Sequence, residues 1–283
     1  MCRHDKSTCV EKVDVLNGRQ RSFYDMMSHA DKIASDEFRL KQLMKVSQRI
    51  KSAGLHVDMS ELVGIFGRQV CNAFAITDNC FNPIGLGVYL RSSCLDHSCR
   101  PNAAAIFTDG NRIQIRALKE IASDEEVLIN YLDLKMSKTD RQEYLSDKYY
   151  FECQCPKCIL DFDNFDYDLV DKLDNDLNEI MKNGDQCDWS AVSTMAGQML
   201  TKCEQLFNGY HPVLTVQMMR TLQIKIFEKV LPPNESGQIL TKDKLNDLRP
   251  LVDKCKEHIR VTHGLEHSLY TYDFKQIISW FDN

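Results

Sequence analysis

The stretch FECQCPKC, residues 151–158, carries three cysteines in a C-x-C-x2-C arrangement. A tight turn at this spacing brings the sulfurs of Cys153, Cys155 and Cys158 to one side, where they can share a metal ion. Zinc prefers four ligands in a tetrahedron, with sulfur at about 2.3 Å, so a fourth ligand must come from elsewhere. Cys99 is the candidate, because it lies in a loop, DHSCRPN, with a proline and an asparagine just after it. The alternative is a group of buried or redox-active thiols that binds no metal.

A site of four thiolates has no open coordination position, so it would be structural and would hold two distant chain segments together. One segment contains Asp96 and His97, and the other contains Tyr149 and Phe151. Tyr131 closes the strand that lies between them in the sequence. The sequence therefore predicts an aromatic-rich pocket for a small molecule, bounded by strand ends and a metal-bound segment.

The composition excludes several classes of protein. The chain has 283 residues, 43% of them hydrophobic, and a net charge of −6, which argues against a disordered polyelectrolyte or a basic nucleic-acid-binding surface. No apolar run reaches the roughly 18–20 residues of a membrane span, and the first residues lack the apolar stretch of a secretory signal. We therefore expect the 12 cysteines to lie in a reducing compartment, with no membrane and no direct nucleic-acid partner.

The hydrophobic periodicity predicts an α+β fold, with a short helical region, a β-rich middle and a helical C-terminal part. Asp109 and Gly110 stand between two apolar runs and predict a hairpin, because glycine tolerates the positive φ of such a turn. Residues 1–20 are polar and show no periodicity. Helices are predicted over 35–53, 62–76, 137–149, 167–181, 189–207, 211–230 and 242–260, and strands over 85–90, 103–107, 112–118 and 126–132.

Three segments in order resemble motifs of the SET-domain lysine methyltransferases. DHSCRPNAAAIF is similar to their NHSC-x-PN segment, EEVLINYLD to their catalytic-tyrosine strand, and FECQCPKC to their post-SET zinc cluster. Further motifs narrow the resemblance to the SET-and-MYND (SMYD) subfamily, and the likeness extends over most of the chain. These motifs are SFYD at Ser22, VCNAFAI at Val70 and VTHGLEHS at Val261.

The resemblance implies S-adenosylmethionine as the methyl donor and a protein lysine, histone or non-histone, as the acceptor. It implies that Tyr131 is catalytic and orients the target amine, and that Phe74 and Tyr149 line the lysine channel. The implied cofactor contacts are Asn72, Ser93, Leu95, Asp96, His97, Tyr131 and Phe151, and the implied zinc ligands are Cys99, Cys153, Cys155 and Cys158.

The resemblance also divides the chain. It implies a partial SET domain with a helical insert over residues 21–135, a post-SET zinc-binding segment over 136–160, and a helical domain similar to tetratricopeptide (TPR) repeats over 161–283. Residues 1–20 are expected to be an unstructured or remnant terminus. Because no G-x-G precedes Ser22 and no C-x2-C-rich finger fits before it, we expect a short form that lacks the MYND finger and the first SET strands.

Two functions follow from these observations. The first is a protein-lysine N-methyltransferase of SMYD type, located in the nucleus, the cytoplasm or both. The alternative is a catalytically impaired SET scaffold, whose helical C-terminal part binds protein partners.

Overall fold

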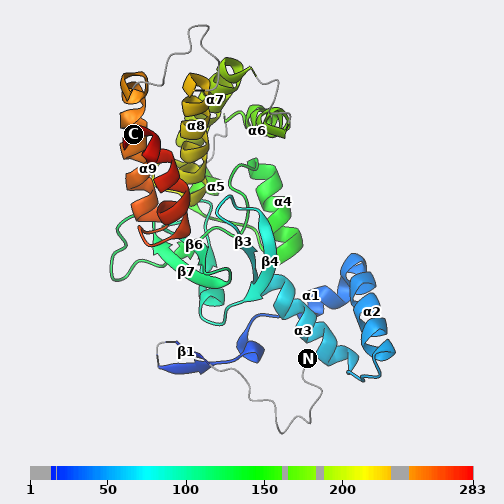
Figure 1. Cartoon of the computed structure of the whole chain (residues 1–283). Coiled ribbons are helices and arrows are strands. Elements are labelled where there is room, and N and C mark those ends of the chain that lie inside the picture. Colours follow the sequence, from blue (N-terminus) through cyan, green and yellow to red (C-terminus); the bar gives the residue numbers. More distant parts are fainter. Residues whose placement is uncertain (1–13, 17, 161–164, 183–187, 231–241, 283) are drawn as a thin grey trace. The chain divides into compact units, whose positions relative to one another are not determined.

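The structure, a computed structural model, describes residues 14–16, 18–160, 165–182, 188–230 and 242–282. The chain forms two compact units and has the α+β composition that the sequence predicts (Figure 1). The first unit comprises Met1–Ile76, Ile84–Asp96 and Gln142–Cys153, and the second comprises Thr77–Pro83, His97–Arg141 and Gln154–Asn283.

The first unit begins with a strand pair. Strands β1 (Asp14–Leu16) and β2 (Arg19–Arg21) run antiparallel, with Val15 opposite Gln20. The sequence indicated no order in residues 1–20, so the structure differs from that expectation in the part of this region that it describes. Strands of three residues are too short to produce a detectable alternation of apolar and polar positions.

Side-chain caps define the helices that follow. The Asp36 carboxylate accepts a hydrogen bond from the Arg39 backbone N–H, and the Asp58 carboxylate accepts from Ser60 and Glu61 at the start of the next helix. The 3-10 helix η1 covers Phe23–Asp25, and the α-helices are α1 (Ala30–Ser35), α2 (Glu37–Ser52) and α3 (Met59–Asn72).

Helix α3 ends earlier than the sequence predicts. The predicted helix over 62–76 is wrong in its last turn, because residues 73–77 form strand β3 (Ala73–Thr77), which pairs with β4 (Pro83–Val88). A short apolar run such as AFAIT fits a buried strand and a helical turn equally well, so periodicity alone places this boundary poorly. The change from helix to strand places Asn72 and Phe74 on different elements.

The second unit contains the predicted hairpin. Strands β6 (Ala103–Thr108) and β7 (Arg112–Ala117) are antiparallel and adjacent (Figure 1). The three-residue loop 109–111 joins the paired residues Thr108 and Arg112, and its residues Asp109 and Gly110 both have positive φ, 52° and 82°. The hairpin prediction is therefore confirmed. Strand β5 (Asp96–His97) pairs with β8 (Leu128–Ile129).

The C-terminal part is helical, as predicted. A buried apolar core that includes Met199, Met218, Leu222 and Ile259 joins its helices, and α7 and α8 lie side by side (Figure 1). Pro250 at the start of α9 separates that helix from the preceding 3-10 turn. The elements are α6 (Tyr167–Lys182), α7 (Trp189–Phe207), α8 (Pro212–Val230), η4 (Lys242–Leu248), α9 (Arg249–Thr262), η5 (Leu269–Phe274) and α10 (Lys275–Asp282).

Two further helices connect or follow the strands, α4 (Lys138–Tyr149) and α5 (Pro156–Leu160). The prediction of a helix over 137–149 is confirmed, whereas α5 and α10 were not predicted. In the part of the chain that the structure describes, no helix is long and apolar enough to span a bilayer.

The VTHGLEHS segment is anchored to the β6–β7 hairpin. His267 Nδ1 accepts from a backbone N–H, so its Nε2 carries the proton and donates to the Phe107 carbonyl at 2.9 Å. Arg116 of β7 donates through Nε to the Val261 carbonyl at 3.0 Å. Gly264 has a φ of 89°, and a side chain there would press against the Arg116 guanidinium. The motif that narrowed the family resemblance therefore has a structural role in this unit.

Removing side-chain volume from the helical core is expected to destabilise the chain. Leu222 is 0% exposed, so Leu222→Ala should lower the free energy of unfolding by about 2–5 kcal/mol through lost burial and a residual cavity. Leu265 is 38% exposed, and Leu265→Ala serves as the matched control with a much smaller effect. Urea unfolding followed by circular dichroism measures both. Equal losses for the two variants would contradict the assignment of this core.

Candidate functional site

The predicted cysteine ligands come together in the structure. The sulfur atoms of Cys99, Cys153, Cys155 and Cys158 all lie within 4.8 Å of one another, and those of Cys99 and Cys158 are 3.6 Å apart. A tetrahedral zinc ion with sulfur at 2.3 Å separates its ligands by about 3.8 Å, so small side-chain adjustments would accommodate it. Cys155 is half-buried, and the other three are buried. The donor set is that of a structural zinc site.

Local hydrogen bonds position the cysteines. The backbone N–H groups of Cys158 and Ile159 donate to the Cys155 carbonyl at 2.9 and 3.0 Å, which forms the turn that begins α5. Gln142 on α4 holds Cys153 with two bonds: its Oε1 accepts from the Cys153 N–H at 2.8 Å, and its Nε2 donates to the Cys153 carbonyl at 2.9 Å. The backbone of the C-x-C-x2-C segment is therefore fixed by its own turn and by a helix.

His97 links a cysteine of this cluster to Tyr131. The Tyr131 backbone N–H donates to His97 Nδ1 at 3.1 Å, so the ring proton lies on Nε2, which contacts Cys99 Sγ at 3.3 Å. The two aromatic rings are 5.3 Å apart. Burial is the main cause that lowers the pKa of His97 to about 4, which keeps the ring neutral. Because both ring nitrogens are engaged, a cofactor contact from His97 would come from its main chain.

Arg141 is a residue that sequence reasoning missed. It is 0% exposed, and its Nη1 donates to the Met136 carbonyl at 2.8 Å and to the Tyr167 hydroxyl at 3.2 Å. Burial by itself would lower the pKa of Arg141, but the bond to Tyr167, the nearby Cys99 and a hydrogen bond with Cys158 outweigh it and raise that pKa. A permanent positive charge therefore lies beside the cysteine cluster. Nothing in the local sequence distinguishes this arginine from an exposed one on a helix.

Two of the predicted cofactor contacts lie at element ends in the first unit. Asn72 is the last residue of α3, and its Nδ2 donates to the carbonyls of Met27 and Arg68, both at 2.8 Å. Its Oδ1 is therefore the group left to meet a ligand. Ser93 lies in the 3-10 helix η2 (Ser92–Cys94), and its hydroxyl donates to the Leu90 carbonyl at 2.9 Å.

The predicted aromatic residues of this unit flank a left-handed backbone position. Tyr149 ends α4, Tyr150 has a φ of 62°, and the rings of Tyr149 and Phe151 are 6.5 Å apart. Phe74 on β3 packs edge to face against Tyr89, with ring centroids 5.9 Å apart. The remaining predicted contacts are Leu95, which ends η2, and Asp96, which is exposed on β5.

The predicted residues thus fall into two groups. The first unit holds Asn72, Phe74, Ser93, Leu95, Asp96, Tyr149 and Phe151, and the second unit holds His97 and Tyr131. Within its own unit, the structure brings His97 together with Tyr131, and Tyr149 together with Phe151.

Comparison with known proteins finds a family match over part of the chain. Residues 3–132, which contain the hairpin, His97 and Tyr131, match the family model of the SET domain. The chain is therefore similar to SET-domain proteins of the SMYD type over most of its length. Histone-lysine N-methyltransferase SMYD3 of Homo sapiens and of Mus musculus is 27% identical to it, over 88% of this chain and 67% of the relative.

Shorter matches involve other members. Histone-lysine N-methyltransferase ASHR1 of Arabidopsis thaliana is 33% identical over 47% of this chain and 28% of its own length. N-lysine methyltransferase SMYD2-B of Danio rerio is 35% identical over 36% of this chain and 23% of its own length. The SMYD resemblance inferred from the motifs is therefore confirmed, while these identities leave the activity of this chain to be tested.

Loss of one clustered cysteine is expected to remove metal. We expect the purified SMYD-type chain to carry one zinc ion, and Cys155→Ser to lose most of it, because a serine hydroxyl is a much poorer zinc ligand than a thiolate. Cys80 is exposed and outside the cluster, so Cys80→Ser is the matched control. Atomic absorption after dialysis against a mild chelator measures the zinc content. Stoichiometric zinc in Cys155→Ser would contradict the four-cysteine site.

Arg141 is expected to support the same site through its charge. Four thiolates on Zn²⁺ carry a net charge of −2, and the buried guanidinium offsets one unit of it. Arg141→Met, which retains length and apolar volume, should weaken zinc binding by about 10–100-fold. Arg112→Met, at an exposed position of β7, is the control. Competition with a chromophoric chelator measures the affinity, and a cobalt(II) spectrum checks that four thiolates still bind. Unchanged affinity would leave Arg141 with a packing role only.

Proposed function

We propose that this chain is an S-adenosylmethionine-dependent protein-lysine N-methyltransferase with Tyr131 at its reaction centre. The SET domain and the histone-lysine or N-lysine methyltransferase activities named for its relatives support the reaction class. The acceptor is a lysine side chain of another protein. Histone and non-histone substrates are both compatible with the names of the relatives.

One observation carries the proposal for Tyr131. Its backbone bonds to His97, and the other side of the same ring contacts Cys99. A zinc ion bound by the four cysteines would therefore fix Cys99, Cys99 would fix the imidazole, and the imidazole would fix the main chain at Tyr131. A tyrosine that orients a reacting amine needs this rigidity, since misplacement by about 1 Å can cost 100-fold in rate.

The chemistry requires an unprotonated amine. Free lysine has a pKa near 10.4, so at neutral pH it must first release a proton to water. An apolar channel favours this release because it disfavours the charged ammonium form. Phe74 and Tyr149 are the proposed walls of that channel. The Tyr131 hydroxyl would then hold the neutral amine in line for attack on the methyl group.

The residues of the first unit fit a nucleoside cofactor. Asn72 retains an amide oxygen acceptor, the Phe151 ring offers a flat surface, and Ser93 and Leu95 bring backbone groups at the end of a 3-10 turn. When bound, S-adenosylmethionine supplies a methyl group on a positively charged sulfur. The Asp96 carboxylate is exposed. It would face the positively charged sulfur while remaining accessible to water.

We further propose that the chain acts in a reducing compartment, the nucleus, the cytoplasm or both. No disulfide joins the cysteines of the described residues, which include the buried Cys203 and Cys255. The helical C-terminal part would contribute to the choice of protein partners.

This function can be tested with the zinc-loaded chain, tritiated S-adenosylmethionine and two sets of acceptors. The acceptors are core histones and an array of lysine-containing peptides. We expect saturable cofactor binding by calorimetry and methyl transfer to lysine. Tyr131→Phe should reduce turnover on the order of 100-fold, because the amine loses its orienting hydroxyl. Tyr272, which is 70% exposed, provides the control variant Tyr272→Phe.

Cofactor binding with unchanged turnover in Tyr131→Phe would remove Tyr131 from the reaction centre. Absence of both cofactor binding and transfer would instead favour the alternative function, a SET scaffold that binds protein partners.

A further inference from the structure

A pocket of about 670 Å³ lies within the second unit, among residues to which the proposed methyl transfer assigns no cofactor or substrate contact. Its walls come from the segment after Cys99, the end of β7, the start of α5 and the loop between α7 and α8. The residues that the argument uses are Arg100, Lys119, Lys157, Phe165, Phe207 and His211. The volume lies in the roughly 300–1,000 Å³ range of small-molecule sites.

His211 lines this pocket, and one of its ring nitrogens has no hydrogen-bond partner among the described residues. It is 5% exposed, and its Nδ1 accepts from the Val213 backbone N–H at 3.3 Å. The ring proton therefore lies on Nε2, and among the described residues this buried donor has no hydrogen-bond partner. A buried donor without a partner is costly, so an acceptor atom of a ligand would be stabilised there. Burial lowers the pKa of His211 to about 3, which keeps the ring neutral and a donor through Nε2.

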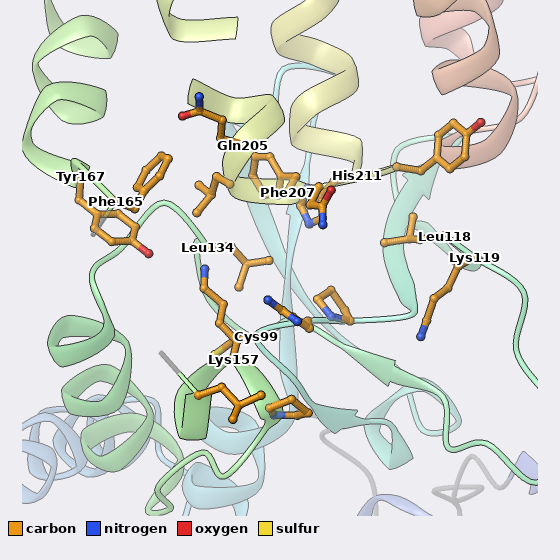
Figure 2. Close-up of a pocket in the computed structure, with 17 residues that line it drawn as sticks. Cys99, Leu118, Lys119, Leu134, Lys157, Phe165, Tyr167, Gln205, Phe207 and His211 are labelled. Atoms are coloured by element: carbon orange, nitrogen blue, oxygen red, sulfur yellow. The ribbon is translucent and has the colours of Figure 1, made fainter. Parts of the chain in front are cut away.

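The neighbours of His211 are flat and apolar. The Phe207 ring stacks on His211 with centroids 4.2 Å apart and an angle of 11° between planes. Phe165 packs edge to face on Tyr167 at 4.7 Å, also in the lining. Figure 2 shows Phe207 and His211 on the helical side of the pocket, with Cys99 and Lys157 on the opposite side. Such walls favour a ligand with a flat ring.

The charge of the lining is positive. Arg100, Lys119 and Lys157 contribute cations, and no Asp or Glu occurs among the described residues that line the pocket. Glu125 pairs with Lys119 at 3.2 Å and offsets its charge, whereas Arg100 has no ion pair among the described residues. Glu257 accepts from the Tyr210 hydroxyl at 3.3 Å and pairs with Arg260 at 2.7 Å. In a chain with a net charge of −6, the absence of a lining carboxylate among the described residues and the Arg100 guanidinium favour an anion in this pocket.

We propose that this pocket binds a small organic anion in which a flat, apolar ring carries a carboxylate. The ring would lie against Phe207 and Phe165, and the carboxylate would accept from His211 Nε2 and interact with Arg100 at the rim. This site is separate from the proposed lysine and cofactor residues, and it shares only Cys99 with the metal cluster.

Titration of the full zinc-loaded chain with indole-3-acetate tests the proposal, with its neutral amide, indole-3-acetamide, as the matched ligand. Calorimetry and ligand-observed NMR measure the binding directly, independently of methyl transfer. We expect saturable binding of the acid, roughly tenfold or more tighter than the amide, because hydrogen bonds to a charged group are worth about 1.5–3 kcal/mol.

Variants locate the site. His211→Phe removes the donor and retains a ring for stacking, and Arg100→Gln with Lys119→Gln removes two cations from exposed positions where folding is not at risk. Both changes should weaken binding of indole-3-acetate several-fold, whereas Lys256→Gln, an exposed lysine on α9 outside the pocket, should not.

Three outcomes would overturn the proposal. The first is that neither indole compound shows saturable binding. The second is that the acid and the amide bind with equal affinity, or that the wild-type chain and both pocket variants bind indole-3-acetate with equal affinity. The third is binding of an acetylated tetraglutamate peptide when indole-3-acetate does not bind, which would make the pocket a peptide-docking surface.

Discussion

A buried guanidinium beside a group of sulfurs is the constraint on which the centre of the second unit depends. Arg141 is fully buried, and removing a charge from water costs several kcal/mol unless opposite charge is close. Thiolates at Cys99 and Cys158 would supply that charge, and zinc would keep these groups deprotonated at neutral pH. The positive charge of Arg141 and the negative charge of the thiolates would thus stabilise each other in the buried environment. A group of neutral thiols would leave the arginine uncompensated, so the arginine itself favours a metal-bound cluster over inert cysteines.

The same cluster limits the freedom of the chain around Tyr131. His97 contacts Cys99 through one nitrogen and the Tyr131 backbone through the other. A neutral imidazole in one fixed tautomer makes hydrogen bonds in two defined directions. Fixing the group on one side of the ring therefore helps to fix the group on the other side. An ion that takes no part in chemistry can in this way set the accuracy of a reaction centre several bonds distant. In the proposed enzyme, a structural metal site would contribute to catalysis in this physical sense.

Sequence reasoning worked where the physical signal is local. The hairpin at Asp109 and Gly110, the long amphipathic helices and the cysteine spacing each follow from short-range geometry. It failed at residues 73–77, where an apolar run is ambiguous, and at β1 and β2, which are too short to show alternation. The grouping of Cys99 with a segment more than fifty positions away was within reach because metal chemistry demands a fourth ligand.

Arg141 and the orientation of His97 were beyond sequence reasoning. Whether an arginine on a helix is buried depends on the packing of the whole unit, and neither periodicity nor residue type reports it. The engaged ring nitrogens of His97 likewise depend on a contact between residues 34 positions apart. His211 behaves similarly, because its Nε2 lacks a partner only in the finished fold.

The anchoring of the VTHGLEHS segment to the β6–β7 hairpin has a consequence for biosynthesis. His267 and Phe107 are 160 positions apart, and Arg116 and Val261 are 145 apart. At about 5–20 residues per second, translation separates the appearance of these partners on the order of ten seconds. Throughout that interval the β6–β7 hairpin of the nascent chain lacks these contacts and is open to chaperones and to aggregation. Completion of this contact must therefore await the emergence of residues 261–267 from the ribosome, and translational pausing before Val261 would prolong the vulnerable state.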